Sequence, residues 1–74
     1  MYEEYEDLFN RKLATEEEIV EKYGPFDYQK YEDSVPQKHG YYIAETDEYG
    51  NPKYVVVVNV FTDGDFLQAY LTTP

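Results

Sequence analysis

Side chains that could carry out catalysis are few in this sequence. Ser34 is the only serine, His39 is the only histidine, and there is no cysteine or tryptophan. A serine–histidine–acid triad can be written from Ser34, His39 and any of the sixteen acidic residues, but so many acids make such a combination a matter of chance. Paired carboxylates for glycoside hydrolysis are also available, yet that chemistry needs a substrate cleft that 74 residues rarely form. The sequence therefore predicts no enzymatic activity and no catalytic residues.

Two short acidic segments could bring carboxylates together around a cation. They are Asp47-Glu48 and Asp63-Gly64-Asp65, and Ca²⁺ prefers oxygen ligands. Neither segment has the alternating ligands and closing glutamate of an EF-hand loop. Asp and Gly are common in hairpin turns for backbone reasons alone. The four glycines are isolated, so no phosphate-binding loop is present. We expect turns here and neither a metal nor another cofactor.

Negative charge dominates the composition. Sixteen acidic residues against six basic ones give a net charge of −10. Residues 1–33 contribute −7 and residues 34–74 contribute −3. Such a chain repels nucleic acids and anionic membranes and attracts basic protein surfaces. The predicted partner is therefore a basic protein, and direct binding to nucleic acid or membrane is not expected.

The spacing of the acids could create a recognition surface. Carboxylates three or four residues apart on a helix have Cβ atoms roughly 5–6 Å apart and could imitate a row of phosphates. Ten tyrosines accompany them, and tyrosine is a favoured rigid contact residue. The alternative is an ordinary solvated surface that keeps the domain in solution. The candidate partner-binding residues are Glu3, Glu4, Glu6, Asp7, Glu17, Glu21, Asp47, Glu48, Tyr2, Tyr5 and Tyr49.

Two helices are predicted to carry most of these acids. In residues 2–13 the apolar residues recur at helical spacing, with glutamates and an aspartate between them. Thr15-Glu16-Glu17-Glu18 matches a capping box and predicts a helix over 16–23, which Gly24-Pro25 ends. Only Ala14 and Thr15 would separate the two helices. Residues 1–24 are thus predicted to form a helical arm.

The remaining chain divides into a connection and a sheet. Residues 25–40 are irregular and rich in aromatic residues, and a short helical turn is predicted near 27–32. From residue 41 the pattern changes to strands over 41–46, 53–62 and 65–72, with turn residues between them. Phe66, Gln68 and Tyr70 are expected on one face of the last strand.

The predicted fold is a single α+β domain, with two short N-terminal helices packed on a three-stranded antiparallel meander. Residues 53–62 would be its middle strand. The helical arm would cover one face of the sheet. We expect segment 25–40, a second copy of the chain or a partner to cover the other face.

The cytoplasm is the expected compartment. The sequence has no run of about 18 apolar residues, and its first residues are acidic, unlike the basic start of a secretory signal. If a phage encodes the chain, this would be the cytoplasm of the host cell.

In size, acidity and lack of catalytic groups, the chain resembles small inhibitors made by phages and mobile elements. These include DNA-mimic anti-restriction proteins, anti-CRISPR proteins and inhibitors of uracil-DNA glycosylase. The glycosylase inhibitors carry an acid-serine-apolar segment on an edge strand, and Asp33-Ser34-Val35 is similar, although Pro36 follows it at once.

The resemblance implies an inhibitor whose carboxylates occupy the basic groove of a nucleic-acid-binding enzyme, such as a CRISPR effector nuclease. Two alternatives remain open. One is an immunity or antitoxin protein for a basic toxin. The other is a phage assembly or accessory subunit, in which two copies could pair through an edge or face of the sheet.

Overall fold

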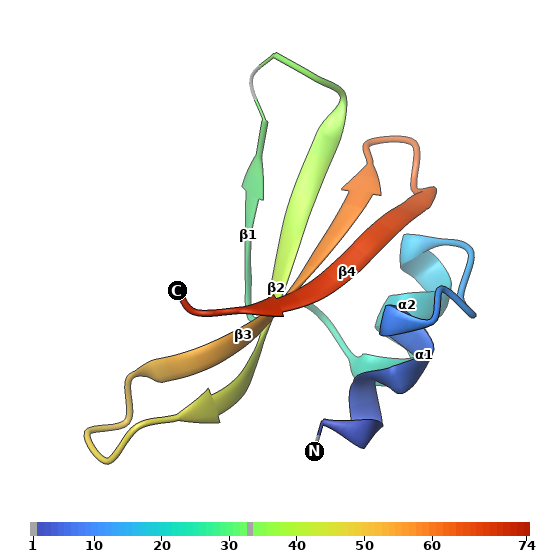
Figure 1. The fold of residues 1–74 in the computed structure, drawn as a ribbon. Helices are drawn as coiled ribbons and strands as arrows, with labels where there is room; N and C mark the ends of the chain where they lie inside the picture. Colours follow the sequence, from blue (N-terminus) through green and yellow to red (C-terminus); the bar gives the residue numbers. More distant parts are fainter. Residues whose placement is uncertain (1, 33) are drawn as a thin grey trace.

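The computed structural model describes residues 2–32 and 34–74. Within these residues the helical part consists of one 3-10 helix and two α-helices, and it is followed by four strands. The helices are η1 (Glu3–Tyr5), α1 (Glu6–Phe9) and α2 (Glu16–Tyr23), and the strands are β1 (Tyr28–Tyr31), β2 (Gln37–Thr46), β3 (Pro52–Phe61) and β4 (Phe66–Thr72). The helices lie on one side of a twisted sheet (Figure 1). The predicted α+β class is confirmed.

The sheet is an antiparallel meander in the order β1-β2-β3-β4. The prediction of three strands was wrong because β1 replaces the helical turn expected near residues 27–32. Tyr28 pairs with Tyr41 and Lys30 with His39, so these backbone groups find partners in β2, which local spacing did not reveal. β2 accordingly begins at Gln37 and is longer than predicted. The 25–40 segment thus adds a strand to the sheet, and its Tyr28 and Lys30 line part of the second face.

A β-bulge near the start of β4 changes which side chains share a face. The register shifts between Asn59 and Val60, so Asn59 pairs with Gln68 while Val60 pairs with Phe66. Phe66 therefore packs against the same core as Ala69. The prediction that Phe66 shares a face with Gln68 was wrong, because an inserted residue breaks the two-residue alternation.

The first helix is much shorter than the predicted 2–13. It ends at Phe9 because Arg11 takes a left-handed conformation with φ 56°. The Lys12 N–H then donates to the Asp7 carbonyl at 2.9 Å and closes the helix end. Glycine normally occupies this position, so an arginine gives no warning in the sequence. Residues 10–15 consequently separate α1 from α2.

The second helix begins and ends where it was predicted. The Glu18 N–H donates to the Thr15 side-chain oxygen at 3.2 Å, which confirms the N-cap. The helix ends before Gly24, whose φ of 86° a glycine adopts readily.

No helix within residues 2–32 and 34–74 is long and apolar enough to cross a membrane.

The core lies between the helices and one face of the sheet. Leu8 and Ile19 are fully buried against alternating valines of β3, Val56, Val58 and Val60. Phe26, which follows the second helix, packs with Tyr42 at a ring separation of 5.2 Å. This core fixes the helical layer on the sheet.

Candidate partner-binding surface

The helical part of the chain forms one connected layer. The Lys22 ammonium of α2 pairs with the Asp7 carboxylate of α1. Tyr5 of η1 also stacks on Tyr23 of α2, with ring centroids 5.7 Å apart. These contacts join η1 and α1 to α2, so the exposed acids of the three helices lie on the surface of one packed unit.

We call this surface the acidic helical layer. Its members are exposed glutamates of η1, α1 and α2, and among the described residues none has a cation within 4.0 Å. They are Glu3, Glu4, Glu6, Glu17, Glu18 and Glu21. Glu18 was not among the predicted contacts, because the capping box had assigned it to the helix start. Its N–H donates to the capping Thr15 side chain, and its exposed carboxylate accepts from the Thr15 hydroxyl at 3.4 Å.

Two other acids of the helical part are already engaged within the fold. Asp7 pairs with Lys22, and Glu16 accepts from the Lys38 ammonium of β2 at 2.7 Å. Asp7 was predicted to contact a partner, but its carboxylate holds α1 against α2. It contributes less free charge to the surface than the sequence suggested.

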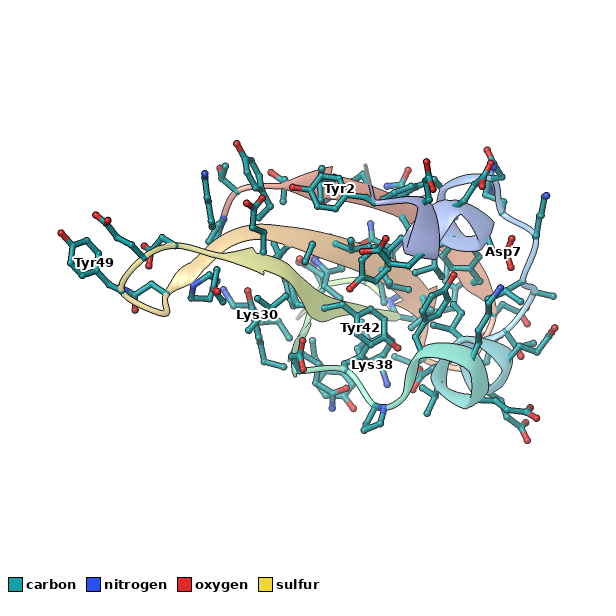
Figure 2. The ribbon with its side chains drawn as sticks, turned by 90° about the horizontal axis from the view of Figure 1, so that it is seen from below. Tyr2, Asp7, Lys30, Lys38, Tyr42 and Tyr49 are labelled. Atoms are coloured by element: carbon teal, nitrogen blue, oxygen red, sulfur yellow. The ribbon has the colours of Figure 1, made fainter. Side chains whose placement is uncertain are left out.

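The predicted acids of the β2–β3 hairpin lie away from the helical layer. Tyr49 is at the tip of this hairpin, at the opposite end of the molecule from Asp7 (Figure 2). The Asp47 carboxylate accepts from the N–H groups of Tyr49 and Asn51, each at 2.9 Å. Asp47 therefore shapes the turn, while Glu48 and the 81% exposed Tyr49 face solvent. The structure does not bring these residues together with the acids of the helices.

The three predicted aromatic anchors have different environments. Tyr49 is free, whereas Tyr5 packs against the core. Tyr2 donates its hydroxyl proton to Glu45 at 2.8 Å and meets Tyr54 edge to face. Of the three, Tyr49 has the most exposed ring.

Several tyrosines are held in their neutral form. The hydrogen bond to Glu45 raises the pKa of Tyr2 to about 12. Burial raises the pKa of Tyr42 to about 12, and its hydroxyl donates to the Gly24 carbonyl at 2.7 Å. Burial likewise raises the pKa values of Tyr5, Tyr23 and Tyr41. These phenols act as packing and hydrogen-bonding groups at neutral pH.

Sequence reasoning expected the second face of the sheet to need a cover but missed the row of tyrosines on it. Tyr28, Tyr41, Val57 and Tyr70 form one row across all four strands. Tyr28 and Tyr41 stack with centroids 4.5 Å apart and planes 8° apart. Together with Lys30 and the C-terminal residues they line a shallow hollow of about 320 Å³. The two-residue alternation of the strands could have indicated which tyrosines and valines share this face. The full row could be predicted only if β1 was recognised as a strand.

The two residues considered for catalysis, Ser34 and His39, lie on different elements. His39 lies in β2, with its Nε2 3.8 Å from a Glu32 carboxylate oxygen. Ser34 is exposed in the β1–β2 connection, and no hydrogen bond joins it to His39 within the described residues. Asp33, from the segment compared with glycosylase inhibitors, lies outside the described residues.

The predicted turn residues serve the backbone. The Asp63 carboxylate accepts from the Asp65 N–H at 3.1 Å, and Gly64 has φ 104°. Together with the Asp47 bonds, this is hairpin-turn chemistry. Over residues 2–32 and 34–74 no group of three or more histidine or acidic residues is placed to hold a metal ion.

Comparison with protein-family models, curated proteins and solved structures finds no match to this chain.

Proposed function

We propose that this protein is a non-enzymatic inhibitor that binds the basic, nucleic-acid-binding surface of a host defence nuclease. The acidic helical layer would occupy the place of nucleic-acid phosphates. A CRISPR effector nuclease of the Cas9 type is the first target to test, because its nucleic acids lie in a positively charged channel.

One observation carries the proposal: six exposed glutamates share one helical layer with no cation beside them in the described structure. Like charges one turn apart, such as Glu17 and Glu21 on α2, repel one another, which costs stability and contributes nothing to packing. The fold does neutralise other acids, since Asp7 and Glu16 have lysine partners. A basic partner would supply the missing cations.

The charge also sets how binding should depend on salt. A chain of −10 is steered toward a positive groove over about 10 Å at 0.1 M ionic strength. Association should therefore be fast at low salt and slow markedly as salt rises, with a smaller effect on dissociation.

The test compares two variants with the same change in net charge. Glu17→Lys/Glu21→Lys reverses two exposed acids one turn apart on α2. Glu32→Lys/Thr62→Lys/Thr73→Lys makes the same change of +4 at exposed positions of the β1–β2 connection, the β3–β4 connection and the segment after β4. Binding of each to a purified Cas9-type effector would be measured by surface plasmon resonance at low and high salt, with circular dichroism to confirm folding.

The proposal predicts that the α2 variant binds at least about tenfold more weakly, a loss of roughly 1.4 kcal/mol, while the control stays close to wild type. Equal losses in both variants would show that total charge matters and the helical layer does not. If the wild type fails to bind the effector, this target is wrong. A host-lysate capture at low and high salt would then supply the next purified candidate, tested with the same pair.

An immunity or antitoxin protein would use the same acidic helical layer against a basic toxin. The same pair of variants applies to it, with neutralisation of the purified toxin as the measurement. A nuclease that is bound but not inhibited would favour this alternative.

A further inference from the structure

The two outer strands of the sheet are built very differently. β1 has four residues, carries Lys30 and lies between Asp27 and Glu32. Short length and charge are the usual protections of an edge strand against further pairing. β4 has seven residues, and no charged residue occurs from Phe66 to Pro74. One edge is protected and the other is not.

Most of the β4 edge is open. The strand start is covered, because the Phe66 N–H donates to the Ala14 carbonyl at 2.9 Å and Thr15 bridges to Asp65. Beyond this point, no backbone hydrogen bond reaches the outer side of residues 67–72 in the described structure. Tyr70 and Leu71 are 43% and 37% exposed there. These unpaired groups form a template for another strand.

We propose that β4 pairs antiparallel with β4 of a second copy, which joins two sheets into one of eight strands. This inference is independent of the proposed function. The edge itself points to a second copy, because it has no charged side chain for a charged partner to pair with, while another β4 is equally uncharged. The two strands are also self-complementary around a twofold axis perpendicular to the sheet.

The symmetry fixes what meets at the interface. Opposed residues in antiparallel strands share a face, so Tyr70 can lie opposite its own copy and Leu71 opposite Ala69 of the second copy. The tyrosine row that already crosses β1 to β4 would continue into the second sheet. Both helical layers would lie on the same side of the joined sheet, which places their acids in one larger surface.

The test uses Leu71→Lys, which places a charge on the open edge at a partly exposed position. Gln29→Lys is the matched control, since it adds the same charge to the exposed β1 edge. Sedimentation velocity would be recorded from about 10 to about 500 µM, because mass action makes dimerisation depend on concentration. Circular dichroism would confirm that both variants fold.

We expect a wild-type dimer whose dissociation constant rises at least about tenfold in Leu71→Lys and stays unchanged in Gln29→Lys. Added salt should strengthen this dimer, because it screens two chains of −10 each, whereas it should weaken binding to a basic partner. Amide exchange in residues 67–72 should slow as concentration rises. A wild type that stays monomeric at high salt, or a dimer that persists in Leu71→Lys, would overturn the proposal. Neither result would bear on binding through the acidic helical layer.

Discussion

Replacing Gly40 with alanine tests how the connection after α2 packs on the sheet. A Cβ at this position would meet three atoms of the Phe26 ring at 2.5 Å, well inside van der Waals contact. Gly40 lies within β2 without a left-handed backbone, so alanine fits the backbone there. Any loss of stability in Gly40→Ala would therefore come from contact with the Phe26 ring.

Two opposing effects set the change in the free energy of unfolding caused by Gly40→Ala. Alanine restricts the unfolded chain and would stabilise the protein by about 0.4–1 kcal/mol. Displacing the ring from its place beside Tyr42 should cost about 1–3 kcal/mol, as overpacking does. The net loss of stability is therefore about 0–2.6 kcal/mol, with a midpoint near 1.3 kcal/mol. For a domain of this size, each kcal/mol lowers Tm by about 4–8 °C.

Urea and thermal unfolding of Gly40→Ala, Phe26→Leu and the double variant measure this directly. Leucine is smaller than the ring, so the double variant should recover at least about 1 kcal/mol relative to the sum of the two single changes. A Gly40→Ala variant that is more stable than wild type, or strictly additive energies, would refute the placement of Phe26 over Gly40.

Further predictions concern the tyrosines, the helix cap and pH. Tyr42→Phe should lose about 1 kcal/mol of stability, because it leaves the Gly24 carbonyl without its donor. Tyr23→Phe should be neutral or stabilising, since the Tyr23 hydroxyl is buried with no partner in the described structure; denaturant midpoints of the two variants would show whether they differ. Thr15→Ala should cost about 1 kcal/mol through the lost cap of α2, and unchanged thermal stability would contradict this. The raised tyrosine pKa values keep protons on the folded state that the unfolded state releases near pH 10. Stability is thus fully retained below pH 10 and falls as pH rises toward 12, by up to about 1.4 kcal/mol per pH unit for the buried Tyr42; a flat urea midpoint between these pH values would be inconsistent with this buried phenol.

The sequence correctly predicted the elements that depend on residues close together in the chain. Helix α2 begins after Thr15 and ends before Gly24, as predicted, because an N-cap and a glycine with positive φ act only on the neighbouring turn of the helix. The valine-rich β3 and the Asp63-Gly64 turn follow from strand and turn preferences in the same way.

The elements that the sequence did not predict mostly depend on contacts between residues far apart in the chain. β1 exists because Tyr28 pairs with Tyr41, and the bulge in β4 depends on the register with Asn59. The left-handed Arg11 ends α1 without a glycine to indicate it. For the candidate surface, the sequence identified acids on the helices but could not show that Lys22 engages Asp7, or that the hairpin tip lies at the other end of the molecule.

The most direct test of the central claim is competition with nucleic acid. The apparent affinity of the protein for a purified Cas9-type effector would be measured with increasing concentrations of guide RNA and target DNA. If the acidic helical layer occupies the groove for phosphates, the apparent dissociation constant should rise in proportion to the nucleic acid added, and the Glu17→Lys/Glu21→Lys variant should lose inhibition of cleavage. Binding that is unaffected by saturating nucleic acid would contradict the account.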